Sequence, residues 1–174
     1  MNSKTNRLAL SAMFVAVMMV LGYIENMIPV IGIPGIKIGL ANSVLLLSLY
    51  WLGITISILL MLVKVGLSSM MFGTLYTFFY SLAGGVLSLL LMIILIYLVR
   101  GISPIGAGVA GAVAHNVGQI LVAMIVFQTN KLIYYMAFLV LVAILTGTLT
   151  GTVAKMLMHY LPKNRKDLFI LNRA

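Results

Sequence analysis

The sequence contains no cysteine and very little acid. Of its 174 residues only Glu25 and Asp167 are acidic, and charged residues of both signs make up 7%. Without cysteine there is no disulfide, thiolate metal site, iron–sulfur cluster or cysteine nucleophile. A single aspartate also excludes chemistry in which clustered aspartates hold magnesium and a diphosphate. We therefore expect no metal site, no cofactor and no catalytic residues, so the chain is not expected to be an enzyme.

The chain is rich in apolar residues and poor in charged ones. Hydrophobic residues make up 63% of the chain and the mean hydropathy is +1.22, whereas a soluble domain has about 45–50% apolar and about 25% charged residues. The chain is therefore expected in a lipid bilayer. Its formal charge of +9 does not indicate nucleic acid as a partner, because the basic residues lie mostly at the ends of apolar segments rather than in a stripe with aromatic residues between them.

Uncharged runs and chain reversals predict the membrane spans. A helix needs about 20 residues to cross the hydrocarbon. The apolar run that begins at Leu8 is longer than a signal-peptide core of about 7–15 residues and has no small-residue cleavage site, so we expect it to be retained. Reversals at Gly53, after the aromatic pair Tyr50 and Trp51, and at Gly73 would place aromatic side chains at the headgroup level. We predict an all-α, polytopic membrane protein with a single domain, residues 1–174, and six transmembrane helices in one bundle, at about 8–28, 39–53, 54–72, 75–99, 104–127 and 133–160.

The distribution of basic residues predicts the orientation. With six spans, Arg7, Arg100 and the basic tail 161–174 lie on one side of the membrane, whereas Lys37 and Lys131 lie on the other. Lysine and arginine are enriched in short cytoplasmic loops. We therefore predict that both termini are cytoplasmic and that the protein is a multi-pass protein of the cell membrane, with a bacterial cytoplasmic membrane as the expected location.

The stretch IPVIGIPGIKIG, residues 28–39, interrupts the helical pattern after the first span. Its prolines and glycines cannot continue a helix. Irregular backbone at membrane depth is tolerated where it is buried in protein or lines a cavity. The stretch is therefore predicted either to fold over the mouth of the bundle as a lid or to be an interfacial connector.

A few polar residues lie inside the predicted spans, where each is a candidate site. Lys64, near the middle of the third span, needs a carboxylate, a polar cavity or an anionic ligand, and a structural pair with Glu25 is the alternative to a ligand contact. His115 and Gln119 share one helical face, and a lone histidine there is expected to form hydrogen bonds rather than to bind a metal. We predict one cavity below the 29–37 loop for a small anionic or strongly hydrogen-bonding ligand. The expected substrate-binding residues are Lys64, Asn42, His115, Asn116, Gln119 and Lys37.

Small residues recur at helical spacing in the first, fourth and sixth spans. In lipid, such faces allow two helix backbones to approach closely. Packing within the bundle is the ordinary explanation for any one of them. In the first span, the face formed by Ala9, Ala12 and Ala16 is also a candidate for docking the helix of a partner protein.

Three stretches resemble a known membrane family. They are residues 33–53 (IPGIKIGLANSVLLLSLYWLG), 81–85 (SLAGG) and 101–120 (GISPIGAGVAGAVAHNVGQI). With their Gly-Leu-Ala-Asn and His-Asn-x-Gly-Gln motifs they are similar to the Gx transporters, also described as heptaprenyl diphosphate synthase component I. The resemblance covers nearly the whole chain. These proteins are in turn similar to the substrate-binding S components of energy-coupling factor transporters.

This resemblance implies a six-helix subunit that binds a small vitamin- or cofactor-type molecule near the outer face of the membrane. It also implies that the first helix, through Ala12 and Ala16, docks on a transmembrane coupling subunit that works with cytoplasmic ATPases. The chain lacks a G-x-x-x-x-G-K-[ST] loop, so other chains would hydrolyse ATP. The alternative is a non-catalytic membrane partner in isoprenoid or quinone metabolism, or in flavin-based extracellular electron transfer. The Asp-rich motifs of prenyl diphosphate synthases are absent.

Overall fold

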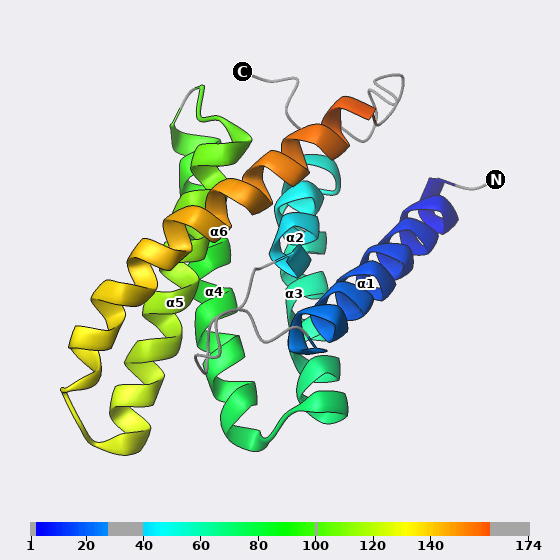
Figure 1. Ribbon diagram of the computed structural model, residues 1–174. Coiled ribbons are helices and arrows are strands. Elements are labelled where there is room, and N and C mark those ends of the chain that lie inside the picture. Colours follow the sequence, from blue (N-terminus) through cyan, green and yellow to red (C-terminus); the bar gives the residue numbers. More distant parts are fainter. Residues whose placement is uncertain (1–2, 28–39, 100, 161–174) are drawn as a thin grey trace.

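The computed structural model describes residues 3–27, 40–99 and 101–160 (Figure 1). Within these residues the chain is entirely α-helical, which confirms the predicted fold class. The loop 28–39 and the tail 161–174 lie outside the described residues. The helices are α1 (Ser3–Met27), α2 (Leu40–Trp51), α3 (Ile54–Phe72), α4 (Leu75–Leu98), α5 (Pro104–Phe127) and α6 (Leu132–Tyr160).

Five of these helices are long and apolar enough to cross a membrane, and α2 is the exception. α2 has 12 residues, which gives a length of about 18 Å, whereas the hydrocarbon core is about 30 Å thick. α1 begins at Ser3, earlier than the predicted span, because hydropathy marks the part of a helix that lies in lipid rather than the end of the helix itself. The number of membrane crossings and the cytoplasmic position of the termini stay predictions.

The beginning of α1 and the end of α6 lie at the same end of the bundle (Figure 1). α2 begins inside the bundle and runs toward that end. The same end of the bundle contains Arg7, in the second turn of α1, and Lys155, near the end of α6. Lys131 directly precedes α6 and lies at the opposite end. Arg7 and Lys155 therefore lie at one end of the bundle and Lys131 at the other, and which of these ends faces the cytoplasm stays a prediction.

α2 forms the centre of the fold. Ten of its twelve residues are buried, and α1, α3, α5 and α6 all contact it. The long helices instead expose large apolar side chains such as Met70, Ile125 and Leu145. A helix that is enclosed by others can be apolar on all sides, whereas exposed apolar faces suit a lipid environment. The bundle is therefore a short inner helix surrounded by longer helices.

The turn between α2 and α3 lies at Gly53, as the sequence predicts. Gly53 has a φ of 85°, which glycine adopts without strain. The hydroxyl oxygens of Ser48 and Ser57, both fully buried, lie 2.8 Å apart across the turn. They also lie 2.7 Å and 2.9 Å from the carbonyl oxygens of Leu45 and Gly53. Each buried hydroxyl thus has partners within the protein, which an apolar environment requires.

The aromatic residues beside this turn do not face lipid. Tyr50 and Trp51 are predicted to be an interfacial pair, but they are only 9% and 8% exposed. The ring centroid of Trp51 lies 6.2 Å from that of Phe14 in α1. The rings therefore pack inside the bundle, where α1 covers the end of α2, and their position at the headgroup level stays a prediction.

α5 packs closely against both neighbouring helices. A Cβ added at Gly147 would lie 2.6 Å from the Cα of Val109, and one added at Gly118 would lie 2.7 Å from the carbonyl oxygen of Ala83. Both contacts are with backbone atoms, which cannot move aside as a flexible side chain can. The small-residue faces of α4 and α6 therefore pack within the bundle, through close backbone approach.

Replacing one glycine of this interface tests how much stability depends on it. A Cβ added at Gly151 would lie 2.5 Å from the Cα of Ile105, so Gly151→Ala is expected to separate α5 from α6 and to lower the free energy of unfolding by about 1–3 kcal/mol. Gly66→Ala in α3 is the matched control, because nothing lies within 4 Å of the added methyl group. The control should leave the melting temperature in detergent unchanged or slightly higher. Equal melting temperatures of the two variants would contradict the proposed packing.

Candidate functional site

One cavity of about 90 Å³ lies between the helices, and all six contribute to its lining. A single water needs roughly 10–15 Å³ of such space, so the cavity has room for several waters or for a compact solute. Its lining combines apolar side chains with an unusual number of polar ones for the interior of a membrane protein. The polar side chains that line it are Glu25, Asn42, Lys64, Ser68, Ser81, Ser88, His115, Asn116, Gln119, Thr146 and Thr150.

The structure brings five of the predicted substrate-binding residues together in this cavity. Asn42 comes from α2, Lys64 from α3, and His115, Asn116 and Gln119 from α5. Helices that are separated in the sequence therefore direct their polar groups to one place. Lys37 and the loop predicted to cover the cavity lie outside the described residues.

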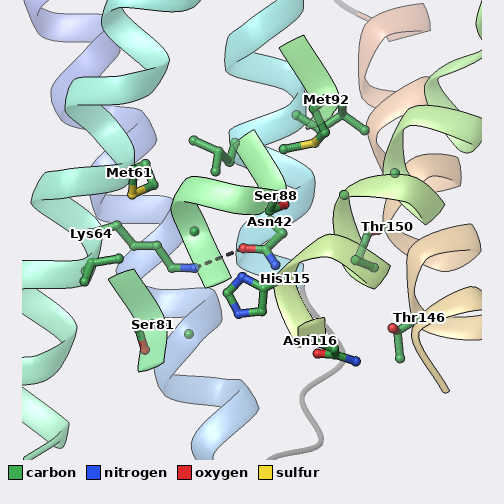
Figure 2. A pocket seen from close by; sticks show the side chains of 18 of the residues that line it. Asn42, Met61, Lys64, Ser81, Ser88, Met92, His115, Asn116, Thr146 and Thr150 are labelled. Carbon is green, nitrogen blue, oxygen red and sulfur yellow. Dashed lines mark hydrogen bonds between the residues drawn. The ribbon is translucent and has the colours of Figure 1, made fainter. Parts of the chain in front are cut away.

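Lys64 reaches the first turn of α2. Its Nζ donates a hydrogen bond to the Oδ1 of Asn42 at 3.1 Å, and Figure 2 shows this contact inside the cavity. An ammonium group at this depth needs polar partners, since lipid provides none. The side-chain amide of Asn42 holds the Lys64 ammonium against the cavity wall.

Glu25 also binds the first turn of α2. Its carboxylate accepts a hydrogen bond from the backbone N–H of Leu40, the first residue of α2. The first N–H groups of a helix lack partners within the helix, and the helix dipole favours a negative charge near them. Glu25 is only 9% exposed and lines the cavity. Because Lys64 and Glu25 both line the cavity, the two predicted roles of Lys64, a pair with Glu25 and a ligand contact, are both compatible with its position.

α5 contributes the opposite wall. The side-chain amide of Asn116 donates to the carbonyl oxygen of Leu139 in α6 at 3.1 Å. A Cβ added at Gly84 of α4 would lie 2.9 Å from the His115 ring and 2.8 Å from its carbonyl oxygen. The glycine therefore provides the space in which the imidazole fits, and the ring points into the same cavity as Lys64 (Figure 2).

Sequence reasoning missed several hydroxyl groups of the lining. Ser81 and Ser88 belong to the small-residue face of α4, and Thr146 and Thr150 of α6 were not among the predicted site residues. All four line the cavity. Their spacing, seven residues in α4 and four in α6, is a signal that could have identified them, since it places each pair on one helical face.

The alanine face of α1 lies outside the cavity. Ala9, Ala12 and Ala16 are all exposed, and the contacts of α1 are mainly with α2 and α3. The face is therefore accessible to another helix within the membrane. Its role in docking a partner stays a prediction.

Comparison with known proteins adds a family match. The family model of heptaprenyl diphosphate synthase component I matches residues 14–157. The match includes every residue that lines the cavity. No curated protein and no solved structure shows a significant match to the chain.

Removing the Lys64 charge tests whether it compensates that of Glu25. Lys64→Met keeps the side-chain volume but removes the charge. If Lys64 compensates Glu25, we expect the free energy of unfolding to fall by about 3–5 kcal/mol, whereas if Lys64 serves a ligand, the variant should be as stable as the unchanged protein or more so. The double variant Lys64→Met/Glu25→Gln should recover most of this loss. Thermal melting in detergent measures the stability of the single and the double variant.

Lys155→Met is the control for loss of one positive charge, because Lys155 is exposed near the end of α6. It should melt like the unchanged protein. If Lys64→Met also melts at that temperature, Lys64 does not stabilise the fold by compensating Glu25.

Proposed function

The chain belongs to the heptaprenyl diphosphate synthase component I family, and we propose that it is a membrane subunit that captures a small cofactor- or vitamin-type molecule for uptake. In this proposal it acts like an S component, without catalysis, in a bacterial cytoplasmic membrane. The observation that carries the proposal is the polar cavity enclosed by all six helices.

The composition of the cavity lining supports binding rather than a purely structural role. A bundle that served only as a scaffold would be most stable with its interior filled by apolar side chains. Polar side chains from all six helices instead face a space with room for a solute. Buried polar groups need partners, and either water or a ligand would supply them. Small-molecule sites commonly combine such polar groups with an apolar wall, which Leu45, Leu46 and Met92 provide here.

Uptake would also need partner proteins. We propose that the exposed face of Ala9, Ala12 and Ala16 docks on a transmembrane coupling subunit, which in turn binds cytoplasmic ATPases. Small side chains would allow the partner helix to approach the α1 backbone closely.

The family description favours a second candidate function. A synthase component implies a partner chain, so the protein could instead be a non-catalytic membrane partner of an enzyme in isoprenoid or quinone metabolism, or a component of flavin-based extracellular electron transfer. The two candidates differ in what the protein binds: a solute and ATP-driven subunits in the first, a biosynthetic or redox protein in the second.

Copurification of a small molecule tests the first candidate directly. Protein purified in mild detergent should carry a small molecule that mass spectrometry of the extract identifies. Thr146→Val removes a hydroxyl group from the cavity lining and should lower its occupancy roughly two- to tenfold, the loss expected for one hydrogen bond. Thr148→Val is the matched control, because its exposed hydroxyl group binds only the Ile144 carbonyl of its own helix. Absence of any bound molecule, or equal occupancy in both variants, would count against the proposal.

A bulky side chain on α1 distinguishes the two candidates. Ala12→Leu would hold a docked helix away from the α1 backbone, so the coupling and ATPase subunits should copurify with the unchanged protein and be lost from this variant. Ala137→Leu, a matching change at an exposed position of α6, should retain them, and both variants should melt normally. Copurification of a prenyl synthase or a redox protein in place of these subunits would favour the second candidate.

A further inference from the structure

The cavity contains one residue of each formal charge. Among the described residues that line it, Lys64 and Glu25 are the formally charged ones, and His115 is the remaining residue with an ionisable side chain. The positive and negative charges of the described lining therefore balance, whereas a site selective for an anion would be expected to carry an excess of positive charge.

Both charged side chains bind the first turn of α2. Glu25 binds the N–H of Leu40 and Lys64 binds the side chain of Asn42, two residues further along the first turn of α2. Their partners therefore belong to one helical turn at the cavity wall. A ligand in the cavity therefore has a carboxylate and an ammonium group among the groups that line it.

The rest of the described lining provides hydrogen bonds but no large flat ring. Amide and hydroxyl groups come from α4, α5 and α6, and no phenylalanine, tyrosine or tryptophan is among the described lining residues. Recognition here would therefore depend on charge and hydrogen bonds rather than on aromatic stacking.

We infer that the cavity selects a compact zwitterion, whose carboxylate pairs with Lys64 and whose ammonium group pairs with Glu25. This inference rests on the proposed function, that the cavity binds a small molecule. An anion would be attracted to Lys64 but would also place a like charge near Glu25, in surroundings where water screens charges poorly. A cation would be attracted to Glu25 but would place a like charge near Lys64. A zwitterion brings an opposite charge to each group and adds no net charge to the membrane interior.

Four molecules with the same three-carbon skeleton test this inference. β-Alanine is zwitterionic, propionate is anionic, propylamine is cationic and propionamide is neutral. Thermal melting of the purified protein in detergent at pH 8 is measured with each at the same concentration. β-Alanine should raise the melting temperature most, with an apparent affinity at least tenfold higher than that of propionate or propylamine. A larger shift with propionate or propylamine, or no preference for β-alanine, would overturn the inference.

Two substitutions in the cavity should change this preference in opposite directions. Glu25→Gln leaves Lys64 as the only formal charge of the described lining, so the preference should move from β-alanine to propionate. Lys64→Met should move it to propylamine. Thr148→Val should keep the preference of the unchanged protein, since its hydroxyl group lies outside the cavity. If both cavity variants fold and still prefer β-alanine, the two charges do not contact the ligand and the inference is wrong.

Failure of this inference can be distinguished from failure of the proposed function. The small molecule that copurifies with the protein shows by its mass and ionisable groups whether it is zwitterionic. A bound molecule with a net charge would overturn this inference and leave substrate capture intact. Absence of any bound molecule, together with no melting shift from the four probes, would overturn both.

Discussion

The first turn of α2 is the point on which the rest of the site depends. This turn lies inside the bundle, where unpaired backbone N–H groups would be costly because lipid offers them no partner. Glu25 of α1 binds the N–H of Leu40, and Lys64 of α3 binds Asn42. One helical turn thus connects three helices through two opposite charges. The arrangement that allows a helix to begin inside the bundle is the same one that brings charged groups to the cavity.

The two sides of the cavity are built differently. On one side, α5 contacts α4 and α6 through backbone atoms, as at Gly118 and Gly147, where an added methyl group would not fit. On the other side, side-chain interactions such as that between Lys64 and Asn42 connect the helices. Side chains can change rotamer, whereas close-packed backbones can only move together. His115 and Asn116 therefore lie on a rigid wall. Any conformational change on ligand binding would involve mainly the side chains of Lys64 and Glu25.

Much of the fold follows from local sequence patterns. Gly53 and Gly73 mark the chain reversals, and α3 and α5 occupy the predicted ranges, because glycine, capping residues and the length of an apolar run act locally. The environment of Tyr50 and Trp51 could not be predicted in this way, since aromatic rings suit both a headgroup region and a contact with a neighbouring helix. The five polar residues of α2, α3 and α5 could be grouped because polar side chains are rare in spans. The position of Glu25 in the same cavity depends on how α1 meets α2, which no local pattern encodes.

The chemistry of the cavity also bears on the family description. A heptaprenyl diphosphate carries several negative charges and a long apolar chain, whereas the cavity measures about 90 Å³ and its described lining contains one lysine and one glutamate. Diphosphates are usually held by several basic groups or by metal ions that carboxylates coordinate. The one lysine and one glutamate of the described lining match neither arrangement. The cavity is therefore poorly suited to the substrate or product of a prenyl synthase, and if the protein works beside such an enzyme, its contribution would lie in contacts between proteins rather than in binding the diphosphate here.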